Sequence, residues 1–343
     1  MTASSTEPGP GAAADRPALP GWGSIVRAIP TALLLMLILV VPAFLLGWFS
    51  NPASFGVVYL GSMVAWLVMI SAGLRAALAA SVALLLLAPL ALLASQAPIA
   101  GACLMAIACL ASGLTSVWGL NLGFRIVPLY LAFLILSPPA LAPGPVPVDS
   151  QPYIYTIMLM LGFGAGWVLL CGRVAGSWLP QPHLISASVQ QALGYTALMA
   201  FLCSVSTFVV MTAHAGHAGA WLILTLLIVL QVAPEDTWSR TKSRVIGTVV
   251  GAVIAAGVGF VATSATALAI WGSLFVLISI IVSLGPRYWL YVTFLTPAVI
   301  LLTAQPGRVM LVDAERVGYT IIGSALAVLA ALVLVWTRAV RLP

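Results

Sequence analysis

One stretch of the sequence alternates basic and small residues in a way that suits binding of an organic anion. It begins at Pro234 and carries, in order, Glu235, Asp236, Arg240, Lys242, Arg244, Gly247, Thr248 and Gly251. A helix starting at Pro234 would place Arg240, Arg244 and Gly247 on one stripe, because residues three and four apart share a helix face. The arginines would attract a carboxylate, and the glycines would let a flat ring or another helix approach the backbone.

Each part of this stretch also has a simpler interpretation. Basic residues gather at any cytoplasmic loop of a membrane protein, so Arg240, Lys242 and Arg244 are also what topology alone predicts. Glycines four residues apart, such as Gly247 and Gly251, are also typical of a helix packing seam. Both interpretations stay open at this level.

Polar and aromatic residues elsewhere in this half could complete an anion site. Thr225 and Thr248 could hydrogen-bond a carboxylate, and Trp221 could stack on a ring or anchor the chain at the membrane interface. A second charged cluster contains Arg308, Asp313, Glu315 and Arg316. It suits an exit gate in which Arg316 receives the anion, or a helix start with a solvated ion pair of little energetic worth.

Residues that could couple transport to protons lie only near the ends of the predicted spans: Glu235, Asp236, Asp313, Glu315, His214 and His217. We expect no Asp, Glu, Lys or Arg at the midplane of any span, which argues against an antiporter built on a buried carboxylate. His214 and His217 lack a neighbouring carboxylate or cysteine, so we expect no metal site and no cofactor. With no phosphate-binding loop or catalytic constellation, we do not expect an enzyme.

The composition identifies the class of protein that must hold these residues. Of 343 residues, 62% are hydrophobic and only 6% are charged, and the mean hydropathy is +1.17. Soluble domains carry roughly 25% charged residues. The sequence therefore excludes a soluble enzyme, a nucleic-acid-binding module and a secreted scaffold, and predicts an all-α polytopic membrane protein.

Apolar runs separated by Pro, Gly or charge predict about twelve transmembrane helices. They lie near 29–48, 55–72, 76–95, 98–118, 124–141, 153–172, 192–212, 218–233, 245–263, 266–284, 288–304 and 317–337. The predicted domains are a disordered tail (1–24), a first six-helix repeat (25–173), a cytoplasmic linker (174–190) and a second six-helix repeat (191–343).

Two short motifs recur at half the chain length. Val148-Asp149 with Tyr155-Thr156-Ile157 reappears as Val312-Asp313 with Tyr319-Thr320-Ile321, at an offset of 164 residues. Six helices per half would make the halves parallel repeats. Eleven of the thirteen basic residues fall on one side of the predicted spans, so we expect both termini in the cytoplasm, in the inner (plasma) membrane.

Several motifs in the second half of the sequence resemble a known family. A Trp-x-x-x-Thr helix, a basic loop, Arg-Val-x-Gly-Thr-x-x-Gly and a last helix opened by Arg with Tyr-Thr-Ile-x-Gly are similar to the fusaric acid resistance family, which includes aromatic acid exporters. The matching residues are Trp221, Thr225, Arg244, Gly247, Thr248, Gly251, Arg316 and Gly323. The resemblance covers roughly 190–340, and the chain would be a minimal member without the family's cytoplasmic domain.

The resemblance implies export of organic anions, above all small aromatic carboxylic acids, often beside a periplasmic adaptor protein. The alternatives are a non-transporting subunit or scaffold of an efflux assembly, and an anion channel. The expected partners are the anion, membrane lipid, the adaptor and further copies of the chain, with no nucleic acid.

Overall fold

The computed structural model describes residues 30, 34, 37–46, 52–141, 147–175, 184, 186–283 and 287–339, and this part of the chain contains helices and no strand. The predicted tail 1–24 and most of the predicted linker 174–190 lie outside the described residues. After a first helix (Leu37–Leu46), the elements are α2 (Pro52–Ala72), α3 (Leu74–Ala94), α4 (Pro98–Leu114), η1 (Thr115–Trp118), α5 (Asn121–Phe124), α6 (Ile126–Leu136), α7 (Gln151–Ala175), α8 (Val189–Thr212), α9 (Gly216–Val229), α10 (Pro234–Val261), α11 (Ala265–Ser283), α12 (Tyr288–Thr303) and α13 (Val309–Ala339).

The helices fall into long and short ones. Within the described residues, eight are long and apolar enough to cross a membrane, which confirms an all-helical membrane protein. Four apolar segments are shorter: Leu37–Leu46, Asn121–Leu136, Gly216–Val229 and Tyr288–Thr303. The 14 residues of α9 extend about 21 Å, less than the roughly 30 Å of a hydrocarbon core. Twelve full spans therefore remain a prediction.

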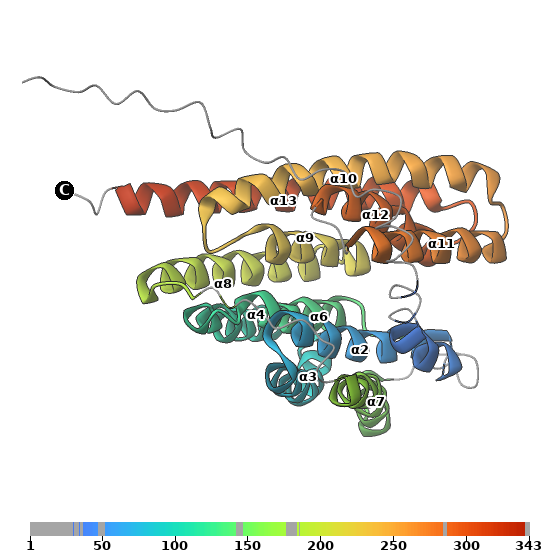
Figure 1. Cartoon of the computed structure of the whole chain (residues 1–343), viewed down its shortest axis with the longest axis horizontal. Coiled ribbons are helices and arrows are strands. Elements are labelled where there is room, and N and C mark those ends of the chain that lie inside the picture. The colour runs from blue at the N-terminus through green and yellow to red at the C-terminus, as the bar shows by residue number, and fades with distance from the viewer. Residues whose placement is uncertain are drawn as a thin grey trace, which may run out of the picture.

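Helices of the two predicted halves pack in matching pairs. α2 packs on α7 and α3 on α6, and at the predicted offset their counterparts α9 and α13, and α10 and α12, also pack on each other. This pattern agrees with the predicted duplication without establishing it. Figure 1 shows α3 and α7 nearly end-on, whereas α8, α10 and α13 run across the page, so these two groups cross steeply.

Two apolar cores hold the bundle together. The larger joins the helices up to α9 with the far end of α13, and it includes the close pairing of α4 with α8, which come from different predicted halves. The smaller is built from α10, α11, α12 and the start of α13. Large apolar side chains such as Leu86, Leu159 and Phe260 are exposed, as a lipid-facing surface requires.

The start of α10 is fixed by its sequence. Pro234 occupies the first turn, where its missing N–H is not needed, and Ala233 before it is extended. The Gln231 backbone N–H donates to the Thr237 hydroxyl at 3.0 Å. This hydrogen bond gives a partner to a backbone N–H in the irregular link between α9 and α10. The prediction of a helix beginning at Pro234 and running through the basic stretch is confirmed.

Candidate functional site

Three arginines are buried in the interior of the bundle. The exposed fractions of Arg244, Arg316 and Arg125 are 2%, 1% and 5%. Within the described chain, Arg244 Nε, Arg316 Nε and Nη1, and Arg125 Nη1 have no hydrogen-bond partner. Asp313 is the only buried acidic residue there. Unpaired buried charge is costly, so it marks a candidate site for a negatively charged ligand.

Arg316 on α13 lies over an aromatic ring. Its guanidinium carbon is 4.0 Å from the centroid of the Trp221 ring on α9, a cation–π contact. Trp221 in turn meets Phe133 and His217 edge-on, with ring centroids 5.7 Å apart in both cases. Phe133 belongs to α6, so this aromatic group joins the two predicted halves of the chain.

Tyr291 on α12 connects Arg316 with Arg244 on α10, because it interacts electrostatically with both. The two helices are antiparallel: Gly259 near the end of α10 packs on Val309 at the start of α13. Arg316 lies seven residues after Val309, about 10 Å along α13. Arg244 lies fifteen residues before Gly259, about 22 Å along α10. Arg244, Thr248, Tyr291, Arg316 and Trp221 are called the Arg244 cluster below.

A second group surrounds Arg125, which lies between α5 and α6. Arg125 interacts electrostatically with Tyr195, Arg240 and Tyr288. The Asn121 amide donates to the Tyr195 hydroxyl at 3.4 Å, and the Arg240 guanidinium carbon is 5.2 Å from the centroid of the Tyr288 ring. These five residues are called the Arg125 cluster. Arg240 and Arg244 are one helical turn apart, so the two clusters are neighbours.

The threonines predicted at the site have different surroundings. The Thr225 hydroxyl is fully buried and donates to the Trp221 carbonyl at 2.8 Å, so its proton is already used within α9. The Thr248 hydroxyl is also buried but has no partner among the described residues. Thr248 follows Arg244 by one turn on α10, which places its hydroxyl on the same face.

The glycines of α10 pack against α12. A Cβ built on Gly247 would come within 2.6 Å of the Trp289 carbonyl oxygen, and one on Gly251 within 2.6 Å of the Thr293 carbonyl oxygen. Gly323 on α13 contacts α9 in the same way, because its Cβ would lie 2.9 Å from the Leu222 carbonyl oxygen. Of the two interpretations open for Gly247 and Gly251, this geometry favours the packing seam.

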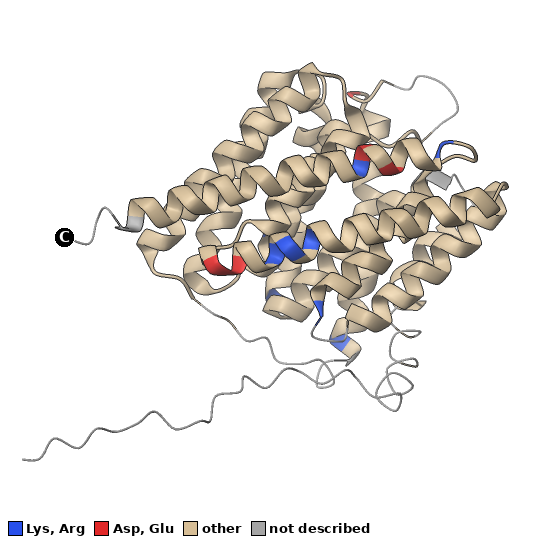
Figure 2. Cartoon of the chain, turned by 90° about the horizontal axis from the view of Figure 1, so that it is seen from above, with Lys and Arg blue, Asp and Glu red and all other residues tan. Residues whose placement is uncertain are grey.

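The other predicted charges lie farther out. Lys242 is exposed and lies over the Trp238 ring at 4.8 Å, pointing away from the Arg244 cluster. Glu235, Asp236 and Glu315 are exposed as well. Figure 2 shows that charged residues are few along the described chain.

Among the coupling candidates, the structure brings Asp313 and His217 to the Arg244 cluster. Asp313 interacts electrostatically with Arg316 one turn later, although no ion pair within 4.0 Å joins them in the described chain. His217 meets the Trp221 ring edge-on and interacts electrostatically with Arg316. His214 lies on the exposed turn before α9, with φ of 52°. In the described residues, no group of three or more metal-binding side chains comes together.

Three charged residues lie inside helices that are longer than the sequence predicted. The spans predicted at 245–263 and 317–337 belong to candidate spans that run from Pro234 to Val261 and from Val309 to Thr337, so Arg244, Asp313 and Arg316 lie within them and not before them. Burial within the protein shields these three side chains from lipid. The expectation that no Asp, Glu, Lys or Arg lies at the midplane of a span stays a prediction.

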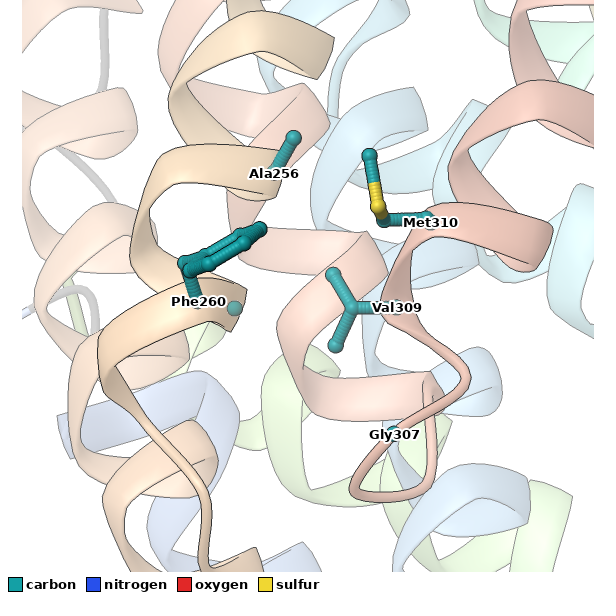
Figure 3. A pocket seen from close by; sticks show the side chains of 6 residues that line it. Ala256, Phe260, Gly307, Val309 and Met310 are labelled. Atoms are coloured by element: carbon teal, nitrogen blue, oxygen red, sulfur yellow. The ribbon is translucent and has the colours of Figure 1, made fainter.

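A pocket of about 260 Å³ lies away from both clusters. It is lined by Ala256, Gly259, Phe260, Gly307, Val309 and Met310. Figure 3 shows Phe260 of α10 and Met310 of α13 on opposite sides of it. No charged side chain lines it, so it offers nothing to hold an anion, and we place the candidate site at the buried arginines instead.

The fold is that of a helical membrane protein with cations buried in its interior. Residues 203–330 match the family described as Fusaric acid resistance protein-like, a membrane family of the transport type, which confirms the resemblance seen in the sequence. The matched region contains the whole Arg244 cluster, whereas Arg125, Asn121 and Tyr195 precede it. Neither the curated proteins nor the solved structures gave a match.

Five members of these clusters were not among the predicted site residues: Asn121, Arg125, Tyr195, Tyr288 and Tyr291. Arg125 was counted only as one of the basic residues that orient the chain. A signal was present, because Arg125 is followed directly by the apolar run of α6, with no polar segment to hold it in water. Tyr288 and Tyr291 are three residues apart on α12, a spacing that places both on one helix face.

Proposed function

We propose that this protein is an inner-membrane exporter of organic anions, small aromatic carboxylic acids, which moves them outward from the cytoplasm. The observation that carries the proposal is the Arg244 cluster. Two arginines at least 98% buried keep unpaired N–H groups beside aromatic rings. A carboxylate would accept hydrogen bonds from Arg244 and Arg316, and the attached ring would pack near Trp221 and Tyr291.

The Arg244 cluster and the residues next to it have different parts in the proposed pathway. Arg240 attracts the anion at the end of the bundle where α10 begins, and Arg244 with Thr248 binds it inside. Arg316 receives it nearer the start of α13. The glycines Gly247 and Gly251 let α12 pack closely on α10, and α12 carries Tyr291, which lies within electrostatic range of both arginines.

The location and partners belong to the same proposal. The match to a resistance family and the apolar helices support a multi-pass membrane protein of the transport type. The proposed location is the inner membrane with both termini in the cytoplasm, where a periplasmic adaptor and further copies of the chain would assemble with it.

The experiment is efflux of radiolabelled hydroxybenzoate from cells that express either the wild type or Arg244→Ala. Removal of a hydrogen bond to a charged group costs about 1.5–3 kcal/mol, so we expect efflux to fall by about tenfold or more. Arg75→Ala is the matched control, because Arg75 is exposed at the start of α3. Unchanged efflux in well-expressed Arg244→Ala would refute the site.

Purified protein in liposomes separates the alternatives. An exporter or a channel moves hydroxybenzoate unaided, whereas a subunit that only scaffolds an efflux assembly does not. A channel also dissipates an imposed anion gradient in both directions at rates that no second substrate or ion gradient changes.

A further inference from the structure

We propose that the Arg125 cluster is a second anion-binding site, built across the two halves of the chain and separate from the Arg244 cluster. It rests on the proposed function, since it would take the same class of ligand, a monocarboxylate. It adds a residue of the first half, Arg125, to a proposed pathway whose other residues lie in the second half, the half that contains the family match.

The first argument is the charge of this cluster. Arg125 is 95% buried and lies within electrostatic range of another cation, the half-buried Arg240 on α10 in the other half. In the described chain no Asp or Glu contributes to the electrostatic surroundings of Arg125. The two cations repel each other, and an anion bound between them would convert this repulsion into attraction.

The second argument is the set of available donors. Arg125 Nη1 and the Tyr288 hydroxyl are buried without a partner among the described residues. The Asn121 amide donates to Tyr195, which leaves the proton of the Tyr195 hydroxyl to be donated elsewhere. A carboxylate has two oxygens and accepts about four hydrogen bonds, which suits donors from Arg125, Tyr288 and Tyr195 together.

The third argument is spacing. Arg240 precedes Arg244 by four residues on α10, and Tyr288 precedes Tyr291 by three on α12. The Arg–Tyr pair of the Arg125 cluster therefore recurs in the Arg244 cluster about one helical turn, or 5–6 Å, farther along both helices. An anion bound at the Arg125 cluster would therefore lie next in line to one at the Arg244 cluster. Its negative charge would push the deeper anion onward, towards Arg316.

Equilibrium binding of radiolabelled hydroxybenzoate to the full chain in lipid nanodiscs tests this proposal. We expect two bound molecules per wild-type chain. Arg125→Gln should weaken one of them by about tenfold or more and leave the other, while Arg316→Gln should do the reverse. Arg75→Gln, which removes an exposed arginine, should leave both unchanged.

Tyr288→Phe keeps the proposal falsifiable if Arg125→Gln does not fold. It removes one unpaired hydroxyl and should weaken only the site that depends on Arg125, by about fivefold. The proposal is overturned if folded Arg125→Gln and Tyr288→Phe bind hydroxybenzoate as the wild type does while Arg316→Gln abolishes binding, a result that leaves the proposed function standing. Absence of any binding to the wild type would overturn both together.

Discussion

Replacing Arg244 by methionine separates a ligand-binding arginine from a structural one. A structural arginine holds its neighbours together, so its loss destabilises the protein. Arg244 instead is buried with its Nε unpaired within the described chain, and such a group costs about 1–3 kcal/mol of folding free energy. Methionine has a similar length and no polar atom. We therefore expect Arg244→Met to unfold at the same temperature as the wild type or at a higher one, by about 2 °C per kcal/mol.

The assay is thermal unfolding of purified protein, with and without hydroxybenzoate. At one hundred times its dissociation constant, an anion that binds only the folded wild type stabilises it by about 2.7 kcal/mol. Arg244→Met should lose this increase although its unfolding temperature without anion is unchanged or raised. Without anion, the unfolding temperature of Arg316→Met should rise less than that of Arg244→Met. Arg316→Met also loses the contact with Trp221 and the charge that offsets Asp313.

Two results would refute this reasoning. One is an unfolding temperature of anion-free Arg244→Met that falls by more than about 2 °C, which would show that Arg244 is held by interactions worth more than its burial costs. The other is a full anion-induced increase in the variant, which would show that the anion binds elsewhere. Arg75→Met is the control for purification and should change the unfolding temperature little in either condition.

Three further predictions concern the seam and the surroundings of the site. Gly251→Ala should lower the free energy of unfolding by about 1–3 kcal/mol, because the new Cβ meets the Thr293 carbonyl oxygen. Gly257→Ala on the same helix has open space around its Cβ and should be neutral or stabilising. Equal unfolding temperatures of the two variants would contradict the packing seam. Asp313→Asn removes a negative charge that competes for Arg316 and should tighten hydroxybenzoate binding about threefold in a binding titration. Glu315→Gln, at an exposed position, should leave the affinity unchanged. Weaker binding to Asp313→Asn would contradict the competition between Asp313 and the anion. Trp221→Leu should weaken binding by about fivefold through the lost aromatic surface, and unchanged affinity would remove Trp221 from the site.

The fold class and the start of α10 were predictable because they depend on local chemistry. Scarce charge and long apolar runs require helices in a membrane, and Pro234 followed by acidic residues is a helix start. The span predicted at 288–304 agrees with α12 (Tyr288–Thr303). The end of α9 was not predictable in the same way. The sequence predicted a span to 233, because apolar residues continue past Val229, whereas packing and the link that Thr237 satisfies end the helix at Val229.

Part of the site followed from spacing and part depended on the tertiary fold. Arg240, Arg244 and Gly247 were predicted on one face of a helix, since their separations of three and four residues fix it. No local pattern indicates that Arg125 and Arg240 lie within electrostatic range of each other, because the two are far apart in sequence and only the tertiary fold places them so. The role of Gly247 and Gly251 also required the structure. It places the carbonyls of Trp289 and Thr293 against them, where the sequence had left both a ligand and a neighbouring helix open.

The seam between α10 and α12 explains how a helix with an internal proline can position the tyrosines of both clusters. Pro297 has no N–H, so the carbonyl of Thr293, four residues earlier, lacks its usual partner within α12. It is this carbonyl that faces Gly251, where the absence of a Cβ lets the backbone of α10 approach and its Cα–H contact the oxygen. Because the same approach sets the position of the whole of α12, it fixes Tyr288 beside Arg240 and Tyr291 beside Arg244. A proline that would weaken an isolated helix is thus matched by a glycine on its neighbour, and the pair brings the hydroxyl-bearing rings of α12 to Arg240 and to the buried Arg244.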